Sequence, residues 1–450
     1  MSNIGENMNE KLEKAKESVS KLADTLNNFE LTREKTMIYA IIGFIVLLVI
    51  LVFYWLFRIS GLDDSNCKKM NDTYKKINTS ITNINENTYN MILPKTGKLP
   101  SIRDFYIKTA YNCCSTGFYK GDFVNKCGLK QCIKQGVRCL DFEIYSYNNK
   151  PVIAVSSIKK NTTKQSYNTL NFNMIMKMIR DYSFSDGYSP CSTDPLFLHF
   201  RIMSKNKHIY KEMKESIVTY LNDYLLSSNY SYEFHGKNIT EEPLMNFKKK
   251  IIIMVNNDNK TYLDTPLAEF VNAATGTNYI NINNYSQGTV FSSTPDEVIL
   301  QNKRGMTFIT PDRGYIPDNP NPVEAMDNYG CQLVAMCFQK YDGYLENYIE
   351  RFEKERSAFI IQPNKFLFVP NLVKLDTLKP QGAIAEVSTK EDILKKQSAA
   401  AATDAAEAAA AAAVADHQPA GAVTAVDLTS MSPAERRELP AKLGGFMADE

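Results

Sequence analysis

The longest run of hydrophobic positions lies near the start of the chain. Met37–Phe57 reads MIYAIIGFIVLLVILVFYWLF, 21 residues without a charge. A helix of this length spans ~30 Å, the thickness of one hydrocarbon core. A cleaved signal peptide is disfavoured because 36 residues precede the run and no small-residue cleavage site follows it. The pattern therefore predicts a single-pass transmembrane helix, with membrane lipid as a partner.

The charges around this run leave its orientation in the membrane open. Basic residues on its two sides are Lys21, Arg33 and Lys35 before it, and Arg58, Lys68, Lys69, Lys75 and Lys76 after it. This excess leans toward a cytosolic C-terminal part. N-x-S/T sequons would suggest the opposite side, and they occur at Asn71, Asn78, Asn161, Asn229, Asn238, Asn259 and Asn284. In a chain so rich in asparagine, chance alone yields several sequons.

Both flanks of the membrane run carry hydrophobic residues at alternating spacings of three and four. Before it they are Met8, Leu12, Ala15, Val19, Leu22, Leu26 and Phe29; after it they are Cys67, Met70, Tyr74, Ile77, Ile81, Ile84, Thr88 and Met91. Such a seam must bury itself against another surface. One interpretation is a homo-oligomer of identical chains joined through a coiled-coil stalk. The other is an amphipathic helix that packs on its own domain or lies on the membrane.

Short apolar runs recur at long intervals between residues 100 and 365. They are Phe105–Asn112, Arg138–Ile144, Val152–Val155, Leu196–Ile202, Ile251–Val255, Met306–Ile309, Leu333–Phe338 and Ala358–Gln362. Several are almost continuously hydrophobic, as expected for strands covered on both faces. Helical patterns at 171–182, 209–225 and 344–355 lie between some of them. Eight strands with helical connections predict an α/β fold, a (β/α)8 TIM-like barrel.

The end of the chain has a different composition. Residues 399–425 contain 16 alanines in 27 positions, and no asparagine follows Asn371. Alanine-rich sequence can form helix but offers no face for a core, so we expect a flexible tail, either a natural extension or a fused foreign sequence. The expected organisation is an amphipathic N-terminal helix over 1–36, the membrane helix over 37–57, a helical stalk over 58–91, the barrel over 92–375 and the tail over 376–450.

Composition removes several classes of function. The net charge is +2, which implies no bulk attraction to nucleic acid. The nine cysteines show neither a C-x-x-C pair nor zinc-ligand spacing, and Cys113 and Cys114 have no histidine nearby in sequence. The chain has four histidines, and none precedes His199.

Four stretches resemble motifs of one enzyme family, in that family's order. GVRCLDFE at 136–143 resembles the second-strand motif G-C-R-C-x-E-L-D of phosphoinositide-specific phospholipase C, and NYGCQLVAMCFQ at 328–339 resembles its W-N-x-G-C-Q-x-V-A-L-N-F-Q. SAFIIQP at 357–363 is similar to the closing G-Y-V-L-K-P strand, and QNKR at 301–304 with Pro311 resembles H-N-x-R-x-L-S-R-I-Y-P. The resemblance covers residues 92–372 and implies a barrel of the phospholipase C phosphodiesterase type.

The resemblance also implies that the catalytic pair is missing. The family's first strand ends in S-S-H-N-T-Y, whose His stabilises the phosphorane; here the run is TAYNCC at 109–114, with Tyr111 at the His position. The family's general acid is the His of Y-H-G, and PVIAVS at 151–156 places Val155 there. Phosphodiester cleavage needs one group to take a proton and another to give one. Tyrosine, with an ordinary pKa near 10, is a poor substitute, and valine cannot transfer a proton.

The family's calcium ligands are partly retained. Its Asn, Glu, Asp and second Glu would correspond to Asn112, Asp141, Glu143 and His199. Three oxygen ligands remain, whereas imidazole suits zinc or iron better than calcium. A divalent metal is therefore the one candidate cofactor, and otherwise none is expected. The alternative is that Asp141 and Glu143 pair with nearby Arg or Lys.

The phosphate-binding positions are altered as well. The later lysines of the family's K-x-L-x-K-x-K strand fall at Met254 and Asn256, and the Arg of S-R-I-Y-P falls at Phe308. We therefore expect a membrane-anchored, catalytically inactive phospholipase C-like protein that acts as a structural or binding module, with structural proteins among its partners. An anchored degenerate enzyme in an Asn/Lys/Ile-rich chain would fit a virion membrane protein of a large DNA virus, in an internal membrane. The alternatives are an active metal-dependent phosphoric diester hydrolase on lipid headgroups, and a headgroup binder without turnover.

Overall fold

The computed structural model describes residues 13–25 except 15 and 22, and residues 33–369 except 95, 159–161, 286–294 and 316–317. Residues 1–371 form one compact unit. The tail expected over 376–450 lies outside the described residues, as do all members of the N-terminal heptad except Val19, whose side chain is exposed.

A barrel of eight parallel strands forms the centre of the described chain. The strand order around it is β8-β7-β6-β3-β2-β11-β10-β9, and every neighbouring pair in this order is parallel. The barrel strands are β2 (Thr109–Ala110), β3 (Cys139–Tyr147), β6 (Leu196–Ile202), β7 (Ile251–Asn256), β8 (Ala273–Thr275), β9 (Ile280–Asn284), β10 (Met306–Thr310) and β11 (Leu333–Met336). The barrel is nearly closed, since β8 and β9 stand at the two ends of this order.

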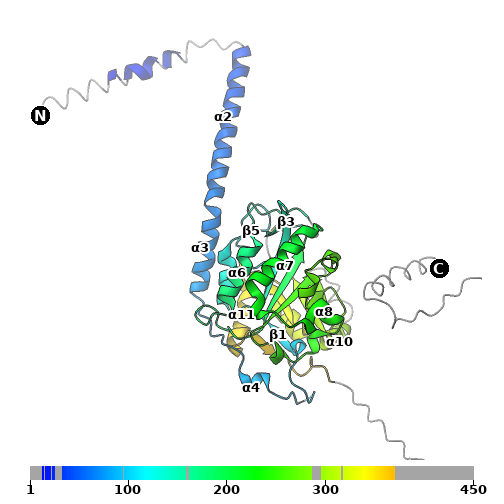
Figure 1. Cartoon of the computed structure of the whole chain (residues 1–450). Helices are drawn as coiled ribbons and strands as arrows, with labels where there is room; N and C mark the ends of the chain where they lie inside the picture. The colour runs from blue at the N-terminus through cyan, green and yellow to red at the C-terminus, as the bar shows by residue number, and fades with distance from the viewer. Residues whose placement is uncertain are drawn as a thin grey trace, which may run out of the picture. The chain divides into compact units, whose positions relative to one another are not determined.

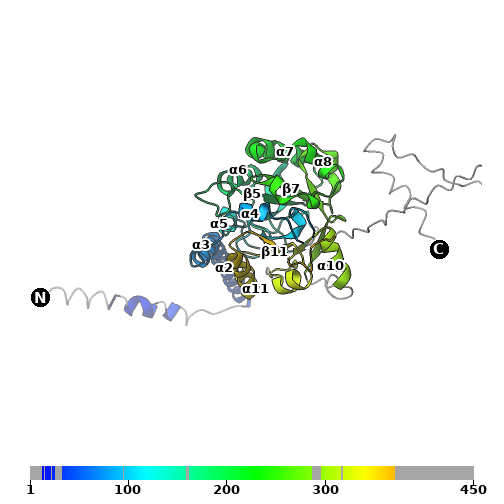
Figure 2. The same cartoon turned by 90° about the horizontal axis from the view of Figure 1, so that it is seen from below.

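Helices surround these strands in the end-on view of Figure 2. Beyond residue 75, the α-helices of the described residues are α4 (Glu86–Tyr89), α5 (Lys126–Lys134), α6 (Phe172–Ser183), α7 (Lys207–Leu221), α8 (Ser231–His235), α10 (Pro295–Arg304) and α11 (Gly343–Glu355). The helices predicted at 171–182, 209–225 and 344–355 correspond to α6, α7 and α11. The α/β barrel predicted from the sequence is confirmed.

Two of the eight predicted strands lie outside the barrel. The run 152–155 belongs to β4 (Lys150–Ile153), which pairs antiparallel with β3 and with β5 (Leu170–Asn171). The run 358–362 belongs to β12 (Phe359–Ile361), which pairs antiparallel with β1 (Phe105–Ile107). The barrel uses β8 and β9 in their place. These strands were missed because β8 is only three residues of Ala and Thr, and β9 alternates isoleucine with asparagine.

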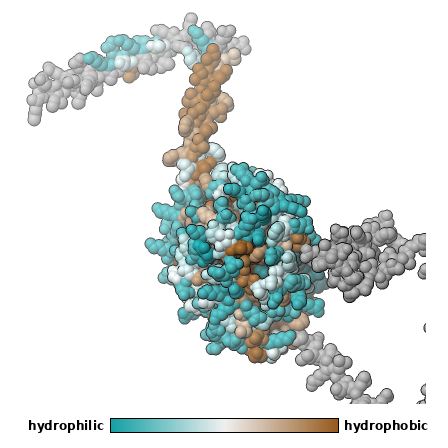
Figure 3. Space-filling model, viewed as in Figure 1, coloured by the Kyte–Doolittle hydropathy of each residue, from teal (hydrophilic) through white to brown (hydrophobic). Residues whose placement is uncertain are grey.

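One long apolar helix precedes the barrel. Helix α2 (Arg33–Ser60) contains the predicted membrane run, and its side chains are exposed along that run. It is long and apolar enough to cross a membrane. Figure 1 shows α2 continuing into α3 (Leu62–Lys75), which lies beside the barrel, and Figure 3 shows the hydrophobic surface of α2 against the mainly hydrophilic barrel.

The predicted helical stalk over 58–91 is wrong beyond residue 75. Helix α3 ends at Lys75, and the following residues run along the barrel to α4. Tyr74, Ile81 and Ile84 are buried in the barrel's own core, and the Tyr74 hydroxyl donates to the carbonyl of Phe338 at 2.7 Å. The barrel offers these side chains a nearer apolar surface than a second chain would. The other interpretation, in which these hydrophobic residues pack on the chain's own domain, therefore holds for this part of the heptad pattern.

A buried carboxyl group holds this segment to the barrel. Asp194 accepts the backbone N–H of Ile84 at 2.9 Å. Burial raises the pKa of Asp194 to about 6, although Arg138 acts to lower it. Because the folded-state pKa exceeds the ordinary value, the carboxyl contributes stability below pH ~4 that is lost as the pH rises through about 6.

We expect Asp194→Asn to stabilise the barrel at neutral pH, because an amide keeps the acceptor and carries no charge. The gain should be on the order of 1–3 kcal/mol at pH ~7.5 and vanish near pH ~4, where the native carboxyl is protonated. Melting temperatures of both proteins at the two pH values measure this. The exposed control Asp223→Asn should match the wild type at both. Equal melting temperatures of Asp194→Asn and wild type at pH ~7.5 would show that the carboxyl is not held in this environment.

Candidate functional site

The candidate site lies where the barrel strands end, at their carboxyl-terminal edge. Asn112 lies two residues after the end of β2 and has a left-handed backbone with φ 44°, which asparagine tolerates better than most residues. Asp141 and Glu143 stand two residues apart on β3, and His199 and Arg201 stand at the same levels on β6, paired with them in register. Since side chains alternate along a strand, all four point to the same side of the sheet, the barrel interior.

The guanidinium group of Arg201 occupies the point where three of the predicted metal ligands meet. Its Nε donates to Asp141 Oδ1 at 2.9 Å and its Nη1 to Glu143 Oε1 at 3.0 Å. Its Nη2 donates to Asp141 Oδ2 at 2.8 Å and to Asn112 Oδ1 at 2.6 Å. Four of the five guanidinium donors are thus engaged by the oxygens that the sequence suggested for a cation. The cation at their centre is a side chain of the protein itself.

Burial makes these charges depend on one another. Burial acts to lower the pKa of Arg201, but Asp141, Tyr111 and Glu143 raise it well above its ordinary value. Burial acts to raise the pKa of Asp141, but Arg201 and His199 hold it well below its ordinary value. The Tyr111 ring lies 4.4 Å from the guanidinium carbon, a cation–π contact, and burial raises the pKa of this phenol to about 12. At neutral pH the site therefore holds a charged Arg201, a charged Asp141 and a neutral Tyr111.

A second arginine completes the cluster. Arg313, which follows β10, forms an ion pair with Glu143 and donates to the carbonyl of Ile158 at 2.9 Å. Glu143 also accepts the backbone N–H of Ser156 at 3.1 Å. Two arginines thus face the two carboxylates Asp141 and Glu143, so their formal charges balance. This is the alternative that the sequence left open, in which the barrel-mouth carboxylates pair with arginine.

His199 is a buried connector between strands. Its Nδ1 lies 2.7 Å from Asp141 Oδ1 and its Nε2 lies 2.9 Å from Thr275 Oγ1 on β8. Burial lowers the pKa of His199 despite the neighbouring carboxylate, so the ring is neutral at pH 7. In the neutral ring Nδ1–H donates to Asp141 and Nε2 accepts from the Thr275 hydroxyl. Of the three other predicted ligands, His199 contacts only Asp141.

A cavity of about 500 Å3 opens above this cluster. Its lining residues are Tyr111, Thr162, Arg201, Ile202, Met203, Ser204, Lys205, Asn256, Asp258, Asn259, Ile282, Asn284, Thr310 and Arg313. The lining contains no histidine, and His199 lies beneath it with no exposed surface. Burial also raises the pKa of the Cys113 and Cys114 thiols, which makes poor nucleophiles of both. The cavity can hold a small polar group, but no imidazole or reactive thiol from the described part of the chain lines it.

The other positions that the resemblance singled out lie around Glu143, His199 and the cavity. Val155, which the resemblance aligned with the family's general acid, is buried directly before Ser156, whose N–H donates to Glu143. Met254 pairs with His199 in the barrel, and Phe308 packs on the His199 ring at 4.5 Å. Asn256, from the other lysine position, lines the cavity.

The sequence reasoning missed Arg201 and Arg313. The signal for Arg201 was its strand pattern, because residues 199 and 201 alternate in step and share one face. The predicted ligand was His199, whereas the register pairs Arg201 with Glu143. Arg313 lies in a loop and left no periodic signal.

Among the described residues, no group of three or more His, Cys, Asp or Glu side chains is arranged to hold a metal ion. Asp141 and Glu143 come with an asparagine and a guanidinium instead. Metal binding by Asn112, Asp141, Glu143 and His199 therefore stays a prediction, and a cation could bind there only if Arg201 moved.

Comparisons with known proteins concern the fold alone. No family model matches the chain, and no curated protein matches it. The solved structure of PLC21 from S. officinalis has 17% identity and a TM-score of 0.48; the match covers 59% of this chain and 38% of that one, so the chain spans well under half of its length. The phosphatidylinositol-specific phospholipase C of Listeria monocytogenes has 14% identity and a TM-score of 0.37 over 60% of this chain and 98% of that one.

A third solved structure is the Ca2+-dependent phosphatidylinositol-specific phospholipase C of Streptomyces antibioticus. It has 8% identity and a TM-score of 0.36, and the match covers 58% of this chain and 99% of that one. These enzymes belong to the family whose motifs residues 136–143 and 328–339 resemble. The barrel architecture of this chain rests on its own strand pairing, described above.

Proposed function

We propose that this protein is a membrane-anchored phospholipase C-like barrel without phosphodiesterase turnover, which acts as a binding or structural module at a membrane surface. The observation that carries the proposal is the position of Arg201. Its guanidinium group takes the place of a divalent cation among Asn112, Asp141 and Glu143. A fixed internal cation balances the carboxylates but has no open coordination position for a substrate oxygen.

The missing proton-transfer groups support the same proposal. Tyr111 is held neutral, Val155 has no titratable proton, and no histidine is among the described residues that line the cavity. General acid–base catalysis needs two groups that exchange protons near the working pH. The rival function, a metal-dependent phosphoric diester hydrolase, would need both a metal in place of Arg201 and a new acid and base.

The loops around the barrel mouth favour a location close to the bilayer. Trp55, near the end of the apolar run of α2, meets Tyr167 of a mouth loop edge-to-face, with ring centroids 6.4 Å apart. Phe118 and Tyr315 are exposed on neighbouring loops and stack at 5.0 Å. An exposed aromatic pair beside an apolar helix suits the interfacial layer of a membrane. The polar cavity would then open close to the lipid headgroups, which keeps headgroup binding without turnover as a variant of the proposal.

The proposal of a homo-oligomer now rests on the N-terminal heptad alone, because the second heptad packs on the barrel. Structural protein partners, and a place in the internal membrane of a large DNA virus, also remain proposals, supported by the sequence character described above.

We expect the purified full chain to release no inositol phosphate from phosphatidylinositol vesicles above the vesicle background, with calcium or with chelator. The reason is that no histidine among the described residues lines the cavity, and that Arg201 leaves no open metal position. Chromatography of the soluble headgroups measures release, and an active bacterial phospholipase C serves as the positive control. Calcium-dependent release that disappears in Asp141→Asn would favour the hydrolase.

A further inference from the structure

The nine cysteines fall into two environments. Seven are buried in the barrel domain as free thiols: Cys113, Cys114, Cys132, Cys139, Cys191, Cys331 and Cys337. Cys67 and Cys127 are only partly buried, and their sulfurs are bonded to each other with a Cα–Cα distance of 5.9 Å. Cys67 lies on α3, the continuation of the apolar helix, and Cys127 lies in the first turn of α5 of the barrel domain. The bond therefore joins the membrane-helix extension to the barrel.

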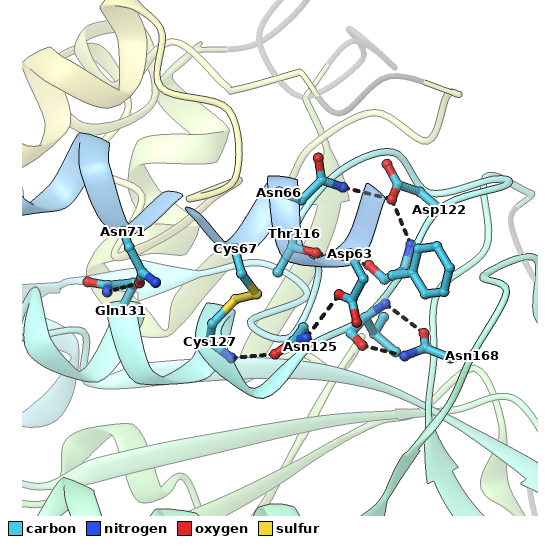
Figure 4. The surroundings of a disulfide bond; sticks show 12 residues. Asp63, Asn66, Cys67, Asn71, Thr116, Asp122, Asn125, Cys127, Gln131 and Asn168 are labelled. Carbon is cyan, nitrogen blue, oxygen red and sulfur yellow. Dashed lines mark hydrogen bonds between the residues drawn. A yellow bond between two sulfur atoms is a disulfide. The ribbon is translucent and has the colours of Figure 1, made fainter. Parts of the chain in front are cut away.

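The contacts beside this bond are mostly polar, as Figure 4 shows. Asn66 Nδ2 donates to Asp122 Oδ1 at 2.8 Å, and Gln131 Nε2 donates to Asn71 Oδ1 at 2.5 Å. Such partly exposed contacts each contribute little net stability, because water competes for the same groups. Helix α3 buries only Met70 and Tyr74, so a covalent bond adds substantially to its attachment.

Asn125 links the two helices that carry the bonded cysteines. Its side-chain oxygen accepts the N–H of Cys127 at 3.0 Å and so caps α5, while its Nδ2 donates to Asp63 on α3 at 2.9 Å. One side chain thus fixes the helix that carries Cys127 and ties it to the helix that carries Cys67. The two sulfurs are held at bonding distance by neighbours on both sides.

We propose that Cys67 and Cys127 form a disulfide that staples the membrane helix to the barrel, and that the barrel therefore lies on the non-cytosolic side of the membrane. The proposal rests on the membrane anchoring proposed above. Disulfides persist in oxidising compartments and are rare in the cytosol, where thiols are kept reduced. On formation the two thiols release two protons and give two electrons to the disulfide of a thiol–disulfide oxidoreductase, which becomes a dithiol.

The charges next to the membrane run are compatible with this orientation. Arg33 and Lys35 lie immediately before it, whereas Arg58 alone lies immediately after it and is followed by Asp63 and Asp64. The lysines that favoured a cytosolic barrel begin only at residue 68, on the stapled helix α3. The charges closest to the bilayer are thus compatible with a cytosolic N-terminus, whereas the count over the wider flanks leans the other way.

The same orientation makes an exposed sequon a site for N-glycosylation. Asn229 is exposed on a short 3-10 turn. By contrast, the Asn259 amide donates to the carbonyls of Ile202 and Ser204 and to the Tyr210 hydroxyl, so the folded barrel has no room for a glycan there. At Asn229 the amide nitrogen would form a bond to the sugar C1 of a lipid-linked oligosaccharide as the bond from C1 to the pyrophosphate breaks, releasing the lipid pyrophosphate and a proton.

The test uses the full chain synthesised into sealed secretory microsomes and alkylated before lysis. We expect the chain to resist carbonate extraction, the barrel to resist added protease until detergent is present, and a Cys67–Cys127 linked peptide to appear by mass spectrometry. Endoglycosidase should shift the chain's mobility, and Asn229→Gln should remove one glycan. In the Cys67→Ser/Cys127→Ser control, fragments cut between the two positions should separate without reductant, whereas wild-type fragments stay joined.

The contrary outcomes are distinct. If the added protease digests the barrel in sealed vesicles while the chain still resists carbonate extraction, the non-cytosolic location is overturned and the anchoring stays intact. Alkylation of both Cys67 and Cys127 in the wild type would show that their thiols are free and would overturn the proposed disulfide. An unchanged glycan number in Asn229→Gln would overturn the assignment of that site. Extraction by carbonate would instead overturn the anchoring itself, and the location with it.

Discussion

Replacing Arg201 by methionine is expected to lower the barrel's free energy of unfolding by about 3–5 kcal/mol, the usual result of removing one partner from a buried ion pair. Methionine fills much of the same volume, so the loss comes from the charges that remain. Asp141 has no exposed surface and would keep only His199 and the N–H of Asn112, at 3.0 Å, as partners. Urea unfolding followed by circular dichroism measures the loss. Arg180→Met is a matched control, because Arg180 is only half-buried and its contacts are an ion pair with its neighbour Asp181 and a cation–π contact with Tyr220.

Calcium should distinguish the Arg201 variants from the wild type. In Arg201→Gln the guanidinium is gone, and Asn112, Asp141 and Glu143 are left around a vacant position with a fourth possible oxygen ligand. Oxygen ligands of this kind suit calcium, so millimolar calcium should raise the variant's melting temperature by several degrees through binding to the folded state. The wild type should show no such rise. A calcium-dependent rise of equal size in the wild type would mean that Arg201 does not occupy the cation position in solution.

The sequence identified the face of this site but not the residue at its centre. The run 196–202 was predicted with the bounds that β6 has, and its alternation brings both His199 and Arg201 to the barrel interior. A shift of two residues along a strand keeps the same face, so periodicity alone does not choose between them. The choice is made by the register with β3, which places Arg201 beside Glu143. Register depends on how strands pair in space and is only weakly encoded in either strand alone.

The second heptad shows a similar limit. The spacing of Tyr74, Ile81 and Ile84 correctly indicated that these residues are buried, but a hydrophobic pattern does not name the surface that buries them. The nearer surface was the chain's own barrel. Burial was thus predictable from the sequence, while the identity of the partner required the structure.

The motif at 328–339 reports the fold of the barrel rather than its activity. Gly330 has a left-handed backbone with φ 71°, and a Cβ there would lie 2.7 Å from the ring of Phe366. Gln332 is buried two residues later. These are two of the positions that match the phospholipase C motif outright. Both lie just before β11, which does not neighbour β6, the strand that carries Arg201, so the motif can remain while the residues around Arg201 differ.

Gln332→Met is therefore expected to destabilise the barrel about as strongly as Arg201→Met. The Gln332 amide donates to the carbonyls of Asn302 at 2.7 Å, Arg103 at 3.1 Å and Gly305 at 3.3 Å, and its oxygen accepts the N–H of Thr307 at 3.0 Å. One side chain thus joins the segment before β1, the end of α10, and β10 to β11. Methionine has a similar volume but satisfies none of these groups. Unpaired buried polar groups cost about 1–3 kcal/mol each, so a total loss of about 3–5 kcal/mol follows even if water reaches some of them.

The matched control is Gln301→Met, because the Gln301 amide donates at the surface only to the carbonyl of Asn278. A surface change of this kind should alter the free energy of unfolding by no more than about 0.5 kcal/mol. Urea unfolding of the two variants under the same conditions gives the comparison. If Gln332→Met unfolded at the same urea concentration as Gln301→Met, the glutamine of this motif would not hold the strands together, and its match to the phospholipase C family would need a functional explanation instead.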